Sequence, residues 1–268
     1  MDSIQIIGYI GALIVGVVLG LIGGGGSILT VPLLVYLLGY NPILATAYSL
    51  FVVGITSLVG TYDKYKKGLV DFEIGLAFSF PSFLAVYLSR RYLVPAIPDV
   101  IMSFGNFELT KDIVIMVFFA LIMLFAAISM IKKKKDLKPS EKKQAYYKTF
   151  IQGITIGTIT GLIGAGGGFL YVPALVLWAN IPMKKAVGTS LIIITINSLI
   201  GFLGDVQNLD IAWDFLLTFT AISVLGILLG GMFSKYVSGG KLKKSFGYFV
   251  LIMAAYIIYR ELLELSVI

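Results

Sequence analysis

The stretch GLIGGGGSILTVPLL, Gly20 to Leu34, places four consecutive glycines inside a long apolar run. A glycine in a helix interior costs about 1 kcal/mol relative to alanine, so an uninterrupted membrane helix would not favour four of them. The stretch GLIGAGGGFLYVPAL, Gly161 to Leu175, is nearly the same sequence again. The glycines therefore need a structural explanation that applies twice in one chain.

The composition is that of a membrane protein. The 268-residue chain is 58% hydrophobic and 13% charged, with a mean hydropathy of +0.97, whereas about a quarter of the residues of a soluble protein are charged. Apolar segments of about 20 residues recur along the whole chain, which is the length needed to cross a bilayer as a helix. We therefore predict an all-α, multi-pass protein of the cell (plasma or inner) membrane.

The chain contains no Cys and no His. This excludes thiolate chemistry, Cys/His metal sites and imidazole proton relays, and we expect no cofactor and no metal ion. An intramembrane enzyme would need buried acid, base or nucleophilic groups, and none is predicted in midspan. The net charge of +7 reflects eight lysines between Lys132 and Lys148, which indicate a cytoplasmic loop and not a nucleic-acid-binding surface.

The chain is a tandem duplication. Residues 20–60 align without gaps onto residues 161–201 at a constant shift of 141, with about 18 of 41 positions identical. We predict a first repeat over 1–135, a Lys-rich cytoplasmic linker over 136–147 and a second repeat over 148–268. Each repeat begins with a glycine-interrupted apolar stretch, about 4–38 and 149–179, and three membrane-length segments follow. These segments are about 42–62, 72–94 and 112–131, then 183–203, 211–234 and 245–263.

The loop charges predict opposite orientations for the two repeats. Loops 63–70, 132–148 and 235–244 are rich in lysine, whereas loop 204–214 holds three aspartates and no Lys or Arg. The positive-inside rule assigns the first three to the cytoplasm and leaves the last outside. The halves then form an inverted repeat, as in many secondary transporters, with both termini outside.

Inversion requires each glycine stretch to leave and re-enter the same face, as a helical hairpin with the glycines at its tip. The arm from Ile28 to Leu38 is 11 residues, about 16 Å long, which is half of a ~30 Å hydrocarbon core. The two tips could therefore approach each other near the midplane. Pro32 and Pro173 fit the first turn of a helix, or mark a kink if the helix begins earlier.

The tips have the chemistry of an anion site. Irregular backbone at membrane depth is tolerated where it lines a cavity, glycines let N–H groups converge, and a helix start adds about half a positive charge. Because every ionisable side chain falls in a loop or near a segment end, a bound anion would be held by N–H groups and hydroxyls. The predicted binding residues at the tips are Gly23, Gly24, Gly25, Gly26, Ser27, Gly164, Ala165, Gly166, Gly167 and Gly168.

Polar residues on the segment after each tip are further candidates. Ser49 and Thr56 share one helix face, and Ser190 and Asn197 repeat the pattern. These groups could contact substrate, or they could join helices, as Ser, Thr and Asn commonly do in membranes. Asn197 is the strongest candidate for substrate contact, because its amide can donate two hydrogen bonds. For the GxxxG positions, such as Gly16 and Gly157, we expect helix packing.

These motifs resemble the sulfite exporter (TauE/SafE) family of membrane transporters. The resemblance rests on both glycine–proline stretches, on LATAYSLFVVGITSLVG and KAVGTSLIIITINSLIG, and on the loop KGLVD, Lys67 to Asp71. It covers both halves and implies that the two tips line a transport site for sulfite or small organosulfur anions. Ala165 departs from the pattern, since the first half has Gly24, and implies a more constrained second tip.

We therefore predict a transporter that exports a small sulfur-containing anion by alternating access between the halves. The partners would be this anion and the lipid bilayer, without nucleic acid, and the sequence does not determine the oligomeric state. A passive small-anion channel and a permease for a non-sulfur carboxylate stay as alternatives. The connection 92–111, with Pro95 and Pro98, has no counterpart in the second half and is expected to be an outer-face cap or a surface helix.

Overall fold

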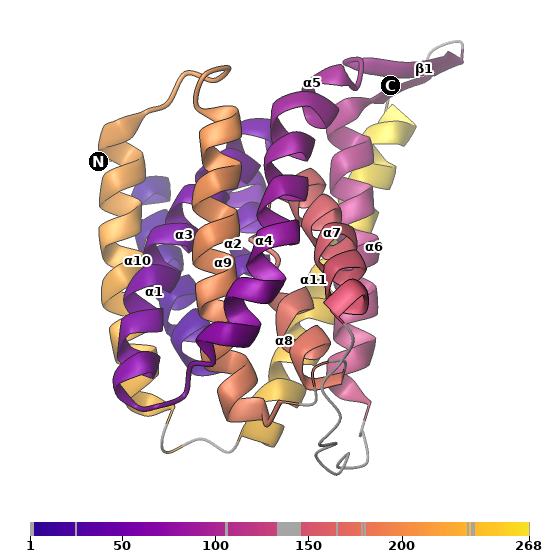
Figure 1. Cartoon of the computed structure of the whole chain (residues 1–268). Coiled ribbons are helices and arrows are strands. Elements are labelled where there is room, and N and C mark those ends of the chain that lie inside the picture. The colour runs from indigo at the N-terminus through magenta and orange to yellow at the C-terminus, as the bar shows by residue number, and fades with distance from the viewer. Residues whose placement is uncertain are drawn as a thin grey trace.

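A computed structural model describes residues 3–267 except 25, 105–106, 133–145, 165, 178, 180, 235 and 237–238. It is a bundle of helices that run alongside one another between two ends (Figure 1). Six helical segments in the described part are long and apolar enough to cross a membrane, which confirms the all-helical membrane class. The long helices are α1 (Ser3–Ile22), α3 (Pro42–Lys66), α4 (Phe72–Leu88), α6 (Lys111–Ile131), α7 (Tyr146–Ile163), α9 (Met183–Asp205), α10 (Trp213–Phe233) and α11 (Gly239–Val267).

Both glycine stretches interrupt a helix. In the first repeat α1 ends at Ile22, and the chain restarts as α2 (Ser27–Pro32), which continues directly into the π-helix η1 (Leu33–Leu37). In the second repeat α7 ends at Ile163 and α8 (Gly168–Leu177) follows. Pro32 is the sixth residue of α2, beyond the first turn. Because proline has no N–H to donate, the regular ladder is interrupted there, and the π-turn begins at the next residue.

The connection 92–111 was expected to be an outer-face cap or a surface helix, and its described residues do not form a surface helix. The helix of α4 continues through the π-helix η2 (Ser89–Leu93) and α5 (Val94–Ala96). The strands β1 (Val100–Phe104) and β2 (Phe107–Thr110) then form an antiparallel hairpin at one end of the bundle (Figure 1). Pro98 separates helix from strand, and the segment beyond it is rich in aromatic and β-branched residues, which favour strands.

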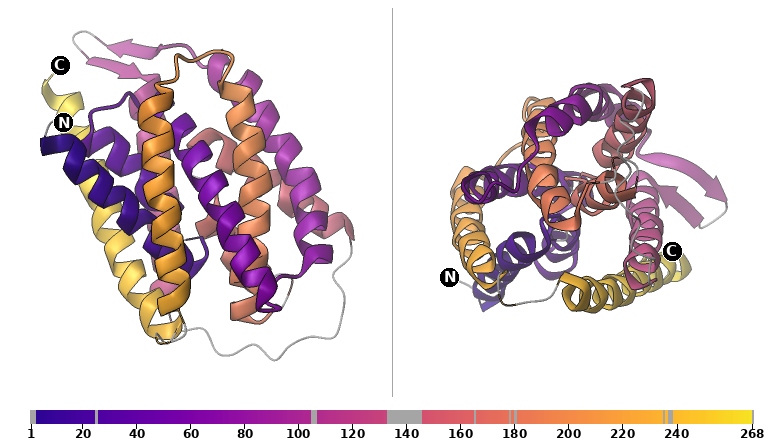
Figure 2. Two further views of the ribbon diagram at one scale, coloured as in Figure 1. Left: turned by 90° about the vertical axis from the view of Figure 1, so that its left-hand side faces the viewer. Right: turned by 60° about the horizontal axis from the view of Figure 1, so that its bottom comes forward.

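Small residues let the helices pack closely, as predicted for the GxxxG positions. A Cβ atom added to Gly16 of α1 would lie 2.0 Å from the carbonyl oxygen of Ser223 in α10. A Cβ atom added to Gly157 of α7 would lie 2.4 Å from the carbonyl oxygen of Ser82 in α4. The backbones of these helix pairs touch, so a side chain at either glycine would force them apart. Two views of the bundle show the same pairs of helices running together (Figure 2).

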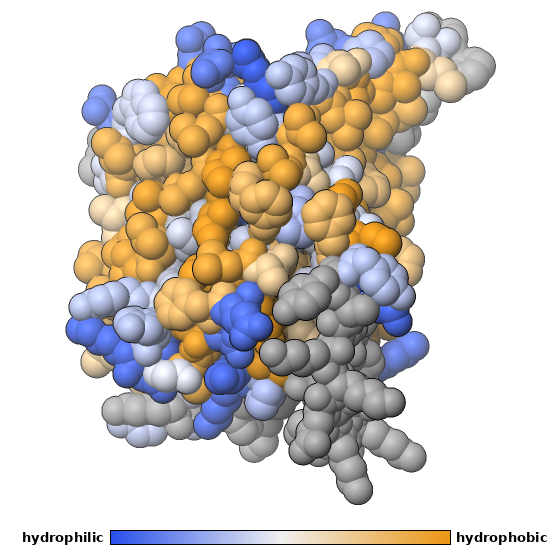
Figure 3. All heavy atoms as spheres, in the orientation of Figure 1, coloured by the Kyte–Doolittle hydropathy of each residue, from blue (hydrophilic) through white to orange (hydrophobic). Residues whose placement is uncertain are grey.

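The surface carries an apolar belt. Figure 3 shows hydrophobic side chains over the middle of the bundle and hydrophilic ones at both of its ends. Large apolar side chains such as Phe125, 72% exposed, and Ile252, 67% exposed, face outward. An exposed apolar area of this extent marks an interaction surface. Its position around helices of membrane length indicates contact with lipid.

Candidate functional site at the glycine turns

The two glycine turns begin in the same way. Gly23 has φ +81° and donates its N–H to the carbonyl oxygen of Leu19 at 2.7 Å. Its repeat partner Gly164 has φ +68° and donates to the carbonyl oxygen of Thr160 at 2.8 Å. Positive φ is the left-handed conformation that ends many helices and that glycine adopts without strain. These two glycines therefore terminate α1 and α7.

The two turns lie against each other. A Cβ atom added to Gly24 would be 2.3 Å from the carbonyl oxygen of Gly168, and one added to Gly168 would be 2.5 Å from Cα of Gly24. No side chain fits at either position without displacing backbone. Stretches that are more than 140 residues apart in the sequence thus meet in the interior of the bundle.

Helices α3 and α9 enclose the pair of turns. Gly164 packs against Thr46 of α3, and Gly23 packs against Val187 of α9. Gly166, at φ +66°, lies beside Ser198 of α9, whose Oγ would be 2.9 Å from an added Cβ. Each turn therefore packs against the long helix that follows the opposite turn, and the second turn also contacts the helix that follows itself.

The remaining tip residues have different surroundings. Gly26 and Gly167 pack on the helix that precedes each of them, with added Cβ atoms 2.5 Å from Val15 O and 2.3 Å from Thr160 Oγ1. Ser27 begins α2, and only its backbone is described. Gly25 and Ala165 lie outside the described residues, as do linker positions 136–145. The structure therefore brings Gly24 and Gly168 into contact, while Gly26 and Gly167 face their own helices.

Buried polar atoms without a hydrogen-bond partner cluster on α3 and α9. In the described part of the chain they include Ser49 Oγ, Thr56 Oγ1, Ser57 Oγ, Asn197 Oδ1 and Ser198 Oγ, all on residues with no exposed surface. A buried polar group that lacks a partner costs free energy. These atoms are therefore suited to bind a polar solute or water. Sequence reasoning missed the repeat partners Ser57 and Ser198 as site residues, although their matched positions were visible.

Two of the predicted polar residues have protein partners. Asn197 donates its amide hydrogens to Ser82 Oγ at 2.7 Å and Tyr171 Oη at 2.6 Å, so it joins α9 to α4 and α8. Ser190 donates to the carbonyl oxygen of Val187 at 2.8 Å, and its Oγ lies 3.4 Å from the carbonyl oxygen of Gly23. In this conformation Asn197 joins helices, which is the alternative to substrate contact that the sequence left open, whereas Ser190 bonds within α9 and lies against the first glycine turn.

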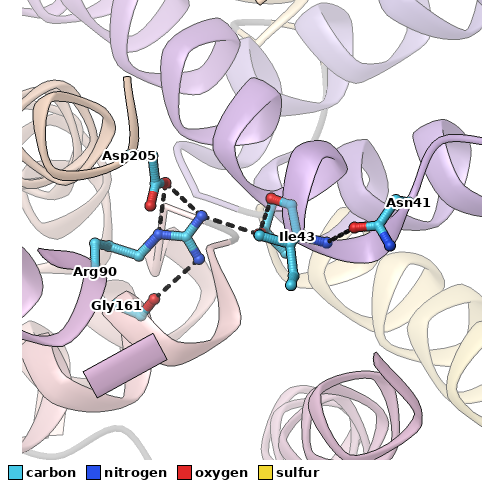
Figure 4. Close-up of polar contacts among 6 residues, drawn as sticks. Asn41, Ile43, Arg90, Gly161 and Asp205 are labelled. Atoms are coloured by element: carbon cyan, nitrogen blue, oxygen red, sulfur yellow. Dashed lines mark hydrogen bonds and ion pairs between the residues drawn. The ribbon is translucent and has the colours of Figure 1, made fainter. Parts of the chain in front are cut away.

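An ion pair is buried beside the second turn. Arg90 of η2 is 1% exposed, and its Nε donates to Asp205 Oδ2 at 2.6 Å while Nη2 also pairs with this carboxylate. Nη2 donates to Thr46 Oγ1 at 3.0 Å, and Nη1 lies 3.4 Å from the carbonyl oxygen of Gly161 (Figure 4). The guanidinium thus links α3, α4's extension, α7 and α9.

This pair could not be read from the sequence. Arg90 and Asp205 are 115 positions apart, and each lies near the end of a predicted segment, where charged residues normally face water or headgroups. The structure instead buries both. The ends of two predicted segments therefore bring a guanidinium and a carboxylate into the interior near the second turn. We had expected only N–H groups and hydroxyls there.

Membrane-length helices around a buried polar centre are characteristic of multi-pass membrane transporters. Residues 9–257 match the family described as "Sulfite exporter TauE/SafE". The chain therefore belongs to the TauE/SafE family, which is a family of transporters and not of enzymes.

Similar proteins cover most of the chain. A "Probable membrane transporter protein" of Xylella fastidiosa (strain Temecula1) is 29% identical over 255 residues, which are 92% of this chain and 92% of the relative. "Probable membrane transporter protein YunE" of Bacillus subtilis is 30% identical over 254 residues, 83% of this chain and 86% of the relative. An archaeal relative, MJ0441 of Methanocaldococcus jannaschii, is 27% identical over 195 residues, 71% of this chain and 68% of its own.

Proposed function

We propose that this protein exports a small sulfur-containing anion, sulfite or an organosulfonate-like compound, by alternating access. The observation that carries the proposal is the contact between Gly24 and Gly168. It brings two turns that begin helices to one buried place. The family match adds the substrate class, because the family is described by sulfite export.

The chemistry of this place suits an oxyanion. The first turn of each following helix has N–H groups without an intrahelical acceptor, and the helix start carries partial positive charge. The unpartnered Ser198 hydroxyl lies beside Gly166 and adds a donor, and we propose that the unpartnered hydroxyls of Ser49, Thr56 and Ser57 face the same place. Neutral donors hold an anion less tightly than a fixed cation would, and a transported ion must also be able to leave.

We also propose that each half is a glycine-tipped hairpin followed by three transmembrane helices. Contacts of α1 support the first hairpin. Gly11 packs against Leu33, and Gly8, one turn earlier, packs against Leu38. A position nearer the start of α1 therefore contacts a position further along the following segment. This order is expected when that segment folds back antiparallel to α1.

A two-fold relation of the halves has its own support, while its inverted sense rests on the loop charges. Gly16 packs on Ser223, and Gly157 packs on Ser82. Gly157 is the repeat partner of Gly16, and Ser223 is the repeat partner of Ser82, each at the shift of 141. Each contact therefore joins one residue of the first half to one of the second. Such an exchange of equivalent contacts is expected of two units related by a two-fold axis.

We assign the Lys-rich segments 63–70, 132–148 and 235–244, which include helix ends, to the cytoplasm and both termini to the outside. The assignment rests on the positive-inside rule and on the hydrophilic ends that flank the apolar belt (Figure 3). With the inside negative, the membrane potential favours anion exit by about 2.3 kcal/mol per charge per 100 mV. Export then needs no proton relay of side chains.

A flux assay tests the function. Purified protein in liposomes loaded with radiolabelled sulfite should release the label faster than empty liposomes, with saturation and with acceleration by external unlabelled sulfite. Conductance without saturation or exchange would favour a channel, and acetate flux without sulfite flux would favour a carboxylate permease. Sulfite flux equal to that of protein-free liposomes would contradict the proposed transport of sulfite.

A further inference from the structure

Lys64 is a buried cation. It lies in the last turn of α3 and is 5% exposed, whereas the sequence assigns it to loop 63–70. Among the described residues its Nζ has one hydrogen-bond partner, Ser234 Oγ at 3.3 Å, and no ion pair. The neighbouring carboxylate of Asp63 pairs with Lys67 at 2.7 Å. The Lys64 ammonium therefore forms no ion pair with a carboxylate of the described part of the protein.

The matched position in the second repeat shows the contrast. Lys64 and Asp205 are repeat partners, 141 positions apart, and each is a buried charge in the last turn of its long helix. Asp205 has a counter-charge, because Arg90 binds it through two nitrogen atoms. Of these two buried charges, only Lys64 lacks an opposite charge in the described structure.

Burial without a counter-ion is costly. Removing an ammonium from water costs several kcal/mol unless an anion compensates it, and an ammonium has three hydrogens to donate. Ser234 accepts one of them. We propose that Lys64 is a subsite that recruits the transported oxyanion, at the end of the molecule that faces the cytoplasm in our orientation. This inference rests on the proposed function and extends it to a second binding position.

A second buried polar residue lies on the same face of α3 as Lys64. Ser57 lies seven residues before Lys64, two turns or about 10.5 Å along the helix, and its buried Oγ has no partner. Gly60 lies between them, where an added Cβ would be 2.5 Å from Cδ1 of Ile227. The Ile227 side chain therefore packs on α3 between Lys64 and Ser57.

Anion-dependent thermal stability tests the subsite. Purified wild type, Lys64→Met and Lys66→Met would be unfolded in detergent at constant ionic strength, with sulfite or sulfate replacing gluconate. Lys66 is the matched control, because it lies in the same turn but is exposed, with its Nζ 4.4 Å from the ring centre of Tyr62. The chain has no Cys, so sulfite has no disulfide to attack.

We expect sulfite to stabilise wild type and Lys66→Met equally. For Lys64→Met the sulfite concentration that gives half of the effect should rise about tenfold or more, because a hydrogen-bonded charge contributes about 1.5–3 kcal/mol. Lys64→Arg should recover most of the affinity, since it restores the charge. If Lys64→Met does not purify as folded protein, Lys64→Gln takes its place, and Lys64→Arg must still respond to sulfite.

The outcomes separate this inference from the proposed function. Equal sulfite responses of wild type and Lys64→Met would overturn the subsite but leave transport at the glycine turns intact. A response that depends on Lys64 in protein that carries no sulfite flux would support the subsite and reject the transport proposal. If neither sulfite nor sulfate stabilises the wild type, both proposals fail.

Discussion

At the scale of single residues, the run of glycines divides into positions with different steric reasons. Gly23 and Gly164 adopt positive φ and end a helix. Gly24 and Gly168 let two backbones touch. Gly26 packs on α1. Gly23, Gly24 and Gly26 are therefore needed as glycines because several backbone segments converge there, in addition to any role of their N–H groups in binding.

The contact between the turns predicts that even a methyl group is harmful. Gly24→Ala and Gly168→Ala would place Cβ 2.3 Å and 2.5 Å from backbone atoms of the other turn, so the turns must separate. We expect sulfite flux per folded protein to fall at least about tenfold, since small displacements at a binding site have effects of this order. The measurement is flux in liposomes, normalised to protein recovered as a single species.

Gly8→Ala is the control for these substitutions. Its added Cβ would meet only the flexible end of the Leu38 side chain, and alanine favours a helix by about 1 kcal/mol over glycine. We expect Gly8→Ala to keep wild-type flux. Full activity of both Gly24→Ala and Gly168→Ala would remove the turns from the transport site.

At the scale of elements, the π-helix η2 positions a charged residue inside the bundle. A π-turn, with its i→i+5 hydrogen bonds, is wider than an α-helical turn and changes which side chains face inward, and such turns are frequent at functional sites. Arg90 lies on η2 and reaches α9, α3 and α7. The ends of four helical segments are therefore joined at one guanidinium.

This arrangement predicts a stability pattern. Arg90→Met or Asp205→Asn alone should lower the free energy of unfolding by about 3–5 kcal/mol, because each leaves the other member of the pair as a buried charge without its counter-charge. The double variant Arg90→Met/Asp205→Leu should recover much of the loss, since no buried charge is left. Thermal unfolding of the purified variants measures both effects.

Arg91→Met is the matched control. Arg91 is the next residue and is only partly buried, with an exposed contact to Asn208 at 3.3 Å, so its loss should change stability by less than about 1 kcal/mol. If Arg90→Met is as stable as Arg91→Met, the buried pair does not hold the helix ends together.

At the scale of the whole molecule, each half uses the other to bury its helices. Helix α1 packs on α10, and α7 packs on α4, so neither repeat encloses its own glycine-interrupted helix. Each turn is likewise held by the long helix of the opposite repeat. The duplicated chain is therefore one folding unit, and the contact of the turns exists only when both halves are present.

The proposed orientation predicts opposite accessibility of two loops. Because the chain has no Cys, single cysteines report position directly. Gln207→Cys should react with a membrane-impermeant maleimide on intact cells, whereas Lys67→Cys should react only after permeabilisation. The reverse labelling pattern would show that the protein has the opposite orientation in the membrane. Reaction of both cysteines from outside would contradict the inverted repeat.

The sequence by itself determined the class of protein and its duplication. Length, hydropathy and repetition are local properties of the chain, and they were enough to predict an all-helical membrane protein with helix breaks at both glycine stretches. The family match agrees with the resemblance seen in these motifs. The sequence could not predict hydrogen-bond partners between helices. Asn197 is an example, because its partners Ser82 and Tyr171 lie on other helices.

Only the tertiary structure decided which groups meet in the interior. The contact of Gly24 with Gly168, the pairing of Arg90 with Asp205 and the burial of Lys64 all depend on segments far apart in the chain. Periodicity and loop charge describe each segment alone and contain no information on its neighbours. Long-range packing therefore determines the electrostatics of the candidate site, because a charge at a segment end becomes buried or paired only when other helices cover it.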